Sequence, residues 1–268
     1  MNKKIGFIGC GNMGGAMISG ICTSKLVASE NIFVSDLNDV ALNNLKDKYG
    51  VNISNDNSEV ASCVDYLVLS VKPNLYAKVI SEIRESVNDV TTIIAIGAGQ
   101  TIEIIQKLFG KNVKVVRCMP NTPAMVLEGM AAICPSGEVS KNQVDDVVQI
   151  FESFGKAEIV KENLMDAVTA VSGSSPAYVF MMIEAMADAA VLDGMPRTQA
   201  YTFAAQAVMG SAKMVLETHK HPGELKDMVC SPSGTTIEAV KVLEETGFRN
   251  SIIQAMNACS DKSKAMKK

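Results

Sequence analysis

Histidine and paired cysteine, on which many catalytic and metal sites depend, are scarce in this sequence of 268 residues. The two histidines, His219 and His221, lie beside one Pro-Gly pair and adjoin no serine, cysteine or carboxylate motif, so a hydrolase or dehydrogenase centred on histidine is poorly supported. The seven cysteines form no Cys-x-x-Cys pair, and their odd number favours reduced thiols over a disulfide framework or a zinc site. We therefore expect a cytoplasmic protein without a bound metal.

An excess of positive charge is also absent. The 25 basic and 29 acidic residues are interspersed and sum to a formal net charge of −4, which gives no broad positive field for nucleic acid or anionic lipid. The uncharged run 5–24 imitates a signal peptide or a membrane span, but its six glycines lower its hydrophobicity. Glu184 and Asp188 argue against a membrane span in the apolar segment 177–192. We expect neither nucleic acid nor a membrane as a partner.

Two kinds of sequence pattern divide the chain near residue 161. Through residues 1–161, short apolar runs alternate with amphipathic stretches, which is typical of βαβ units and a parallel sheet. The predicted strands are 4–8, 31–35, 66–71, 92–96, 113–117, 130–134 and 157–160. The predicted fold class is therefore α/β, with an N-terminal Rossmann domain over residues 1–161 and an all-α domain over residues 162–268.

The second half of the chain has few β-branched runs and carries Ala and Met at helical spacing. Its predicted helix 177–192 is apolar over most of its circumference, which is more than one exposed amphipathic helix tolerates. Two explanations stay open: a second copy of the chain covers the apolar stripe, or the stripe is ordinary core. Periodicity alone favours core.

The clearest motif is Gly-x-Gly-x-x-Gly, which segment 5–14 (Ile-Gly-Phe-Ile-Gly-Cys-Gly-Asn-Met-Gly) places between a predicted strand and a helix. In this context Gly9 permits a tight turn, Gly11 lets the backbone approach a pyrophosphate, and Gly14 allows close packing of helix on strand. The free N–H groups at the helix start face the phosphates. The motif predicts a dinucleotide site, against the alternative of a glycine-rich turn without a ligand.

Asp36 ends the second predicted strand, 22 positions beyond Gly14. A carboxylate there accepts hydrogen bonds from the adenosine ribose hydroxyls and repels a 2′-phosphate. No Lys or Arg lies between Asp36 and Lys46 to offset its charge, so the residues favour NADH over NADPH. The alternative is a turn-forming aspartate exposed to water.

Three further loops, at residues 70–73, 96–99 and 119–123, follow predicted parallel strands, and open α/β sheets bind ligands at the carboxyl ends of such strands. Each loop alone is weak evidence for a ligand site. Lys72 is explained equally well as a solvated side chain, and the prolines are explained equally well as residues that fix turns. Together the three loops predict one ligand-lined edge of the sheet.

Two polar segments interrupt the helical half, at residues 172–177 (Ser-Gly-Ser-Ser-Pro-Ala) and 231–236 (Ser-Pro-Ser-Gly-Thr-Thr). A serine before a proline suits a helix start, which explains the first segment as well as a ligand site does. The second segment opens another predicted helix with small residues and exposed N–H groups. That combination predicts a binding site for a carboxylate.

Taken together, these motifs resemble pyrroline-5-carboxylate reductase, the last enzyme of proline biosynthesis, and the resemblance runs essentially end to end. It rests on segments 7–14, 71–73, 119–123 and 172–178, and above all on 221–239 (His-Pro-Gly-Glu-Leu-Lys-Asp-Met-Val-Cys-Ser-Pro-Ser-Gly-Thr-Thr-Ile-Glu-Ala). Similar sequences usually read Pro-Gly-Gly-Thr where this one has Ser233 in place of the first glycine. A positive φ angle at that position would strain a serine.

The resemblance implies an oxidoreductase that reduces 1-pyrroline-5-carboxylate to L-proline by hydride transfer from NADH or NADPH. It also implies a C-terminal domain that dimerises by interlocking helices, an active site between the cofactor domain and the dimer interface, and a homo-oligomer that is a dimer or a ring of dimers. The implied cofactor contacts are Ile8, Gly9, Cys10, Gly11, Asn12, Met13, Asp36, Asn57, Ser70, Val71, Lys72, Pro73, Ile96, Gly97 and Ala98. The implied substrate contacts are Val229, Ser231, Gly234, Thr235 and Thr236.

Thr236 is the predicted catalytic residue. Its hydroxyl would polarise the imine nitrogen and relay a proton from water, while the backbone N–H groups of Gly234 and Thr235 hold the carboxylate. Ordinary N-capping by Thr236 stays open. Two other functions also stay open. One is a related hydroxyacid dehydrogenase or imine reductase, which is expected to carry a lysine in the helical domain, but the segment after Ser172 has no lysine before Lys213. The other is a dinucleotide-sensing regulator, which would leave residues 231–236 unexplained.

Overall fold

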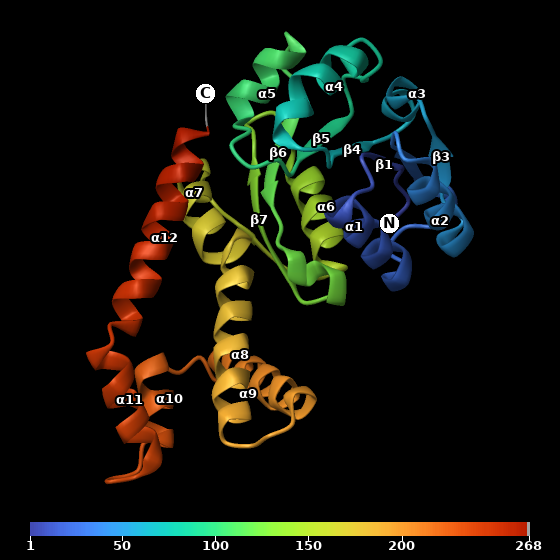
Figure 1. Ribbon diagram of the computed structural model, residues 1–268. Helices are drawn as coiled ribbons and strands as arrows, with labels where there is room; N and C mark the ends of the chain where they lie inside the picture. Colours follow the sequence, from blue (N-terminus) through green and yellow to red (C-terminus); the bar gives the residue numbers. More distant parts are fainter. Residues whose placement is uncertain (267–268) are drawn as a thin grey trace. The chain divides into compact units, whose positions relative to one another are not determined.

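The computed structural model describes residues 1–266 and contains two compact units (Figure 1). Among the described residues, the larger unit comprises 1–174 and 259–266, and the second unit comprises 175–258. The boundary between the units differs from the predicted domain boundary at residue 161, because segment 162–174 and the end of the last helix pack with the sheet. The domain division at residue 161 stays a prediction.

An eight-stranded sheet forms the centre of the larger unit within residues 1–266. Its spatial order is β3-β2-β1-β4-β5-β6-β7-β8, and the first six of these strands run parallel. The strands are β1 (Ile5–Ile8), β2 (Ile32–Ser35), β3 (Asn52–Ser54), β4 (Tyr66–Leu69), β5 (Thr92–Ala95), β6 (Lys114–Met119), β7 (Gly129–Pro135) and β8 (Gly155–Ile159). All seven predicted strands are present and the fold class is confirmed, whereas β3, a three-residue edge strand without an apolar run, was not predicted.

Strand β7 departs from the predicted parallel sheet, since it runs antiparallel to β6 and parallel to β8. The connection between β6 and β7 holds only the short 3₁₀ helix η3 (Thr122–Val126). A parallel crossover needs about a dozen residues or more, usually a helix, whereas a short loop joins antiparallel neighbours. The length of this connection therefore reverses the direction of β7.

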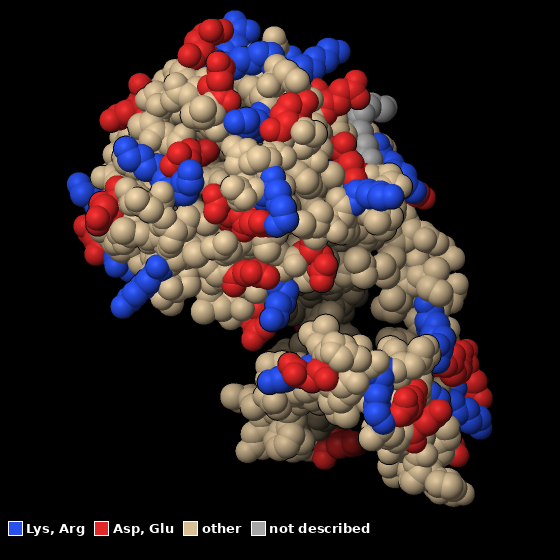
Figure 2. All heavy atoms as spheres, turned by 180° about the vertical axis from the view of Figure 1, so that it is seen from behind, with Lys and Arg blue, Asp and Glu red and all other residues tan. Residues whose placement is uncertain are grey.

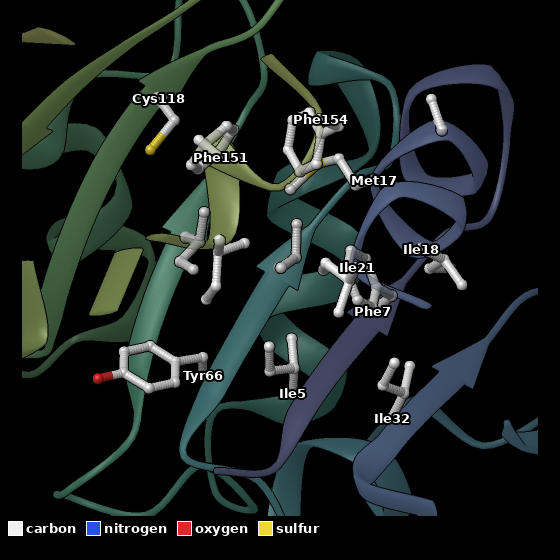
Figure 3. Close-up of a cluster of buried hydrophobic side chains, with 14 of the residues drawn as sticks. Ile5, Phe7, Met17, Ile18, Ile21, Ile32, Tyr66, Cys118, Phe151 and Phe154 are labelled. Atoms are coloured by element: carbon white, nitrogen blue, oxygen red, sulfur yellow. The ribbon is translucent and has the colours of Figure 1, made fainter. Parts of the chain in front are cut away.

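Helices cover both faces of the sheet, as in a doubly wound fold. They are α1 (Asn12–Ser24), α2 (Asp39–Tyr49), α3 (Asn57–Ser62), α4 (Tyr76–Ile83), α5 (Ile102–Phe109) and α6 (Lys141–Glu152), with the short helices η1 (Ser29–Asn31) and η2 (Pro73–Leu75). One buried cluster joins α1, α2 and α6 to the sheet, as Figure 3 shows for Ile21 beside Phe7 and for Met17 beside Phe154. A second cluster joins α3, α4 and α5 to the opposite face. Burial on both faces explains why the strands read as continuous apolar runs.

The chain leaves the sheet through η4 (Glu162–Leu164), α7 (Met165–Val168) and a π-helical turn η5 (Thr169–Gly173), and the second unit follows. The helices of that unit are α8 (Ser175–Leu192), α9 (Arg197–Thr218), α10 (Pro222–Val229), α11 (Thr235–Glu245) and the first part of α12 (Phe248–Ala265). Its α8 packs against α9. Within residues 175–258 the buried side chains are three alanines, Ala187, Ala200 and Ala204.

Three alanines cannot supply a hydrophobic core, and large apolar side chains of α8 and α9 are exposed, Phe180 by 63% and Phe203 by 67%. The apolar stripe of α8 is therefore not core within a single chain. In the described part of the protein, residues 162–192 form the one helical stretch that is long and apolar enough to cross a membrane. This is weak evidence for a membrane span, because an apolar surface between protein copies has the same composition. On the face shown in Figure 2, basic and acidic side chains alternate over the larger unit.

Candidate active site

The glycine loop follows β1 at the point where the chain order of the sheet reverses, since β2 lies on one side of β1 and β4 on the other. Ligands of open α/β sheets bind at such a switch point. Gly9 has a φ of +97°, and a Cβ atom on Gly14 would lie 2.4 Å from the Gly9 carbonyl oxygen. A Cβ on Gly11 would meet nothing within 4 Å. The first and third glycines are thus required by packing, and the second leaves open space beside the backbone.

The start of α1 fits a phosphate group. Its cap residue is Gly11, with no side-chain hydrogen bond at the cap and no acidic residue in the first turn. By contrast, each of the helices α2, α5 and α6 is capped by a side chain that accepts a backbone N–H of the first turn. The capping side chains are those of Asn38, Thr101 and Ser140. The first N–H groups of α1 have no intrahelical acceptor, so they and the positive end of the helix dipole are available to an anion.

Asp36 holds the glycine loop from the end of β2. Its Oδ2 accepts the backbone N–H of Cys10 at 2.6 Å, and its Oδ1 accepts that of Asn38 at 2.9 Å. Asp36 belongs to none of the ion pairs found among residues 1–266. Burial, and next the Asp36 carboxylate, raise the pKa of the Cys10 thiol to about 12, so this thiol stays neutral. A fixed negative charge therefore stands beside the loop without a cation.

Asn57 and Ser70, two of the implied cofactor contacts, bond to the protein itself. The Asn57 amide accepts the hydroxyl of Ser35 at 2.8 Å and donates to Glu82 at 2.8 Å. The Ser70 hydroxyl donates to the carbonyl oxygens of Ile8 and Gly9 at the end of β1. Both residues support the glycine-loop edge, while Lys72, in the loop after β4, is exposed.

Tyr76, which the sequence reasoning did not single out, joins the loops after β4 and β5. Its buried hydroxyl donates to the Leu69 carbonyl oxygen at 2.7 Å and accepts the Gly97 N–H at 2.9 Å. A Cβ on Gly97 would lie 2.8 Å from the Tyr76 ring. Burial raises the pKa of Tyr76, so the hydroxyl remains a neutral donor. In the sequence it reads as one more apolar position of a helix, and no local signal separates it from a core tyrosine.

The loop after β6 joins segment 162–174 through Asn121. The Asn121 Nδ2 donates to the carbonyl and the hydroxyl oxygen of Ser172, both at 3.2 Å, and its Oδ1 accepts the Met130 N–H at 2.8 Å. Ser172 lies in the π-helical turn η5, and such turns are frequent at functional sites. The predicted segment 119–123 and Ser172, the first residue of the predicted segment 172–177, therefore lie together.

The predicted substrate contacts lie in the second unit, where Val229 ends α10 and segment 231–236 leads into the first two residues of α11. Helix α11 begins at Thr235, and its cap residue is Gly234, again without a side-chain hydrogen bond at the cap. Thr236 is therefore the second residue of the helix and not its cap, so the N-capping explanation of Thr236 is wrong. The Gly234 N–H donates to the Ser231 carbonyl oxygen at 3.1 Å. The Gly234 N–H is thus engaged within its own loop, whereas the N–H groups of Thr235 and Thr236 have no intrahelical acceptor. The carboxylate contact of Gly234 and Thr235 stays a prediction.

Ser233 adopts the left-handed conformation, with a φ of +57°. We expect Ser233→Gly to raise the free energy of unfolding by about 0.5–1 kcal/mol, because relief of roughly 1–2 kcal/mol of backbone strain exceeds the entropy that glycine adds to the unfolded chain. Thermal or urea unfolding measures the change. The control Ser251→Gly, within helix α12, should lower stability by about 0.5 kcal/mol. An equal loss in both variants would contradict the strain.

The fold and these two groups of residues define a Rossmann-type dinucleotide-binding protein with a separate helical unit. A family model described as pyrroline-5-carboxylate reductase dimerisation matches residues 162–266, and one described as NADP oxidoreductase coenzyme F420-dependent matches residues 4–99. The chain is 53% identical over 268 residues to the pyrroline-5-carboxylate reductase of Escherichia coli strain K12, covering 100% of both chains. It belongs to the pyrroline-5-carboxylate reductase family.

Solved structures agree over the same length. The chain is similar to a pyrroline-5-carboxylate reductase from Coxiella burnetii, with a TM-score of 0.93, 33% identity and 100% of each chain covered. It is also similar to pyrroline carboxylate reductase from Plasmodium falciparum with NADP bound, with a TM-score of 0.90, 33% identity, and 100% of this chain and 99% of the other covered.

Proposed function

We propose that the protein is an NAD(P)H-dependent oxidoreductase that reduces 1-pyrroline-5-carboxylate to L-proline. The observation that carries the proposal is the start of α11, where uncapped backbone N–H groups adjoin a threonine hydroxyl that does not cap the helix. A substrate with one carboxylate and one imine nitrogen needs these two kinds of donor. The full-length likeness to pyrroline-5-carboxylate reductases supports the same substrate.

The chain's own residues bind and orient the two reactants. Bound NAD(P)H supplies the hydride. The uncapped start of α1 would hold the pyrophosphate of the dinucleotide, and the loops joined by Tyr76 line the same edge of the sheet. The Thr235 and Thr236 N–H groups bind the substrate carboxylate. The Thr236 hydroxyl donates a hydrogen bond to the ring nitrogen, which makes the imine carbon more electrophilic, and relays a proton from water.

A turnover assay tests the proposal directly. Purified protein is mixed with synthetic 1-pyrroline-5-carboxylate and, in parallel, NADH or NADPH, and cofactor oxidation is followed at 340 nm. We expect oxidation that depends on the substrate, with L-proline as product. Binding of a dinucleotide without any substrate-dependent turnover would contradict the enzyme and leave a dinucleotide-sensing regulator.

Asp36 is proposed to set the cofactor preference toward NADH. Asp36→Asn keeps an oxygen acceptor for the Cys10 N–H but removes the charge that would face a 2′-phosphate. We expect the ratio of kcat/KM with NADPH to that with NADH to rise at least tenfold, about 1.4 kcal/mol. Steady-state kinetics with both cofactors measure this ratio. The control is Asp39→Asn, a change at an exposed neighbour bonded to Asn55, and it should leave the kcat/KM ratio unchanged. A strong NADPH preference in the parent protein would show that Asp36 does not face the ribose.

The assembly is proposed to be a homodimer formed through the second unit, in the cytoplasm. The exposed apolar side chains of α8 and α9 support it, as does the match of residues 162–266 to a dimerisation model. A ring of dimers is a larger assembly of the same kind. Analytical ultracentrifugation distinguishes the two, and a monomer at micromolar concentration would contradict both.

A further inference from the structure

The last turns of α12 return to the larger unit and contact it along one face. Cys259 lies with its Sγ 3.2 Å from the Ser174 hydroxyl, and Ser263 donates its hydroxyl to the Asp166 Oδ1 at 2.8 Å. Spacings of four and three residues place 259, 263 and 266 on the same side of the helix. Ser263 is the buried residue of α12, only 4% exposed, and Asp166 in α7 is only 6% exposed.

A buried hydroxyl bonded to a buried carboxylate specifies one position of the helix. An apolar helix end slides against its neighbour at small cost, whereas sliding this helix end would separate a buried hydroxyl from its carboxyl partner and lose the hydrogen bond. The Ser263–Asp166 bond therefore fixes the position of the following turn, which carries Met266.

Met266 meets the loop after β5. Gly99 in that loop has a φ of +76°, and a Cβ on Gly99 would lie 3.0 Å from the Met266 Cβ and 3.1 Å from its carbonyl oxygen. From the other direction the Tyr76 hydroxyl holds the Gly97 N–H. Residues 97–99 are thus held between α4 and the end of α12.

The same helix end forms a wall of a surface pocket of about 410 Å³. Pro73 and Ala98, both implied cofactor contacts, line this pocket together with Tyr76 and Met266. The C-terminal end of the chain and the loops after β4 and β5 therefore share one surface.

We propose that residues 259–266, which we name the C-terminal brace, position the loop of residues 96–99 for the dinucleotide, with Ser263 as the key positioning residue. This inference rests on the proposed function of that loop. Without the brace the loop loses its contact with Met266 and keeps the Tyr76 hydrogen bond and the packing of Ala98 against the cluster of Met119 and Met165. The dinucleotide must then order the Gly99 end of the loop on binding. The free energy spent on ordering the loop lowers the affinity for the dinucleotide more than it lowers kcat at saturating dinucleotide.

The test uses the full-length protein with Ser263→Ala, and the dissociation constants of NADH and NADPH measured by fluorescence without substrate. We expect a rise of at least fivefold for the cofactor that the parent binds more tightly, faster hydrogen exchange at residues 97–100, and a kcat at saturating cofactor within twofold of the parent. The matched control is Ser251→Ala, an exposed serine of the same helix whose hydroxyl bonds to the Gly247 carbonyl oxygen, and it should change none of these quantities.

A chain ending at Ala265, compared with one ending at Met266, provides a second variant and should show the same loss of affinity. It decides the matter if Ser263→Ala does not fold. A lower melting temperature with unchanged dissociation constants in the folded variants would overturn the proposal, because it would make the brace merely structural. Parent protein that binds a dinucleotide but does not turn over pyrroline-5-carboxylate would instead refute the proposed function and leave the brace testable by binding.

Discussion

Replacing Thr236 by alanine should lower kcat by about 10²–10³-fold while the melting temperature changes little. Loss of one positioned donor or proton-relay group in the transition state has an effect of this size. The fold should survive, because Thr236 is half-buried and α11 begins without a side-chain hydrogen bond at its cap. Steady-state kinetics with saturating cofactor, alongside thermal unfolding, give both quantities.

Two companion variants isolate the hydroxyl of Thr236. Thr236→Ser keeps the hydroxyl and should recover most of the rate. Thr246→Ala makes the same change at the other end of α11, where the hydroxyl bonds only to backbone carbonyl oxygens of its own helix, and should leave kcat unaltered. An unchanged kcat in Thr236→Ala would remove Thr236 from the mechanism, and an equal loss of stability and rate would indicate a structural role.

The exposed apolar face of α8 leads to the second large effect, the loss of the proposed dimer in Phe180→Asp. Phe180 keeps 63% of its surface exposed in the single chain, and Met181 beside it 69%. A carboxylate buried at that position in an interface without a partner costs about 3 kcal/mol or more, which weakens association more than a hundredfold. Sedimentation should then report monomers, with a lower melting temperature and lost activity.

The control for this variant is Val90→Asp, which places the same charge on an exposed apolar side chain of the larger unit. It should leave the dimer, the stability and the activity close to those of the parent. A Phe180→Asp protein that remains dimeric would exclude the α8 face from the interface.

Much of the dinucleotide side could be predicted from the sequence because its signals are local. Gly9, Gly11 and Gly14 act through the space beside their own backbone, and the structure gives each the packing or open space expected of it. Asp36 lies beside the glycine loop for the same reason, since strand β2 ends there. Neighbouring residues in a turn of known type determine such a site.

Other features depend on contacts between distant residues and have no local signal. The Tyr76 hydroxyl joins Leu69 to Gly97, and the carboxamide of Asn121 joins the β6 loop to Ser172. No periodicity distinguishes either residue from an ordinary core or turn residue, because the partners are brought together only by the sheet order.

By itself the sequence determined the glycine turn, the strand pattern and the apolar surplus of the second half, since local sterics and side-chain periodicity set each of these. Only the tertiary structure decided the direction of β7, the positive φ of Ser233 and the attachment of Ser263 to Asp166. These three depend on the length of a connection, the closure of a turn and the burial of a polar pair. The pairing of β7 and the Ser263–Asp166 bond join segments that lie apart in the sequence, and the φ of Ser233 follows from the way its loop closes before α11.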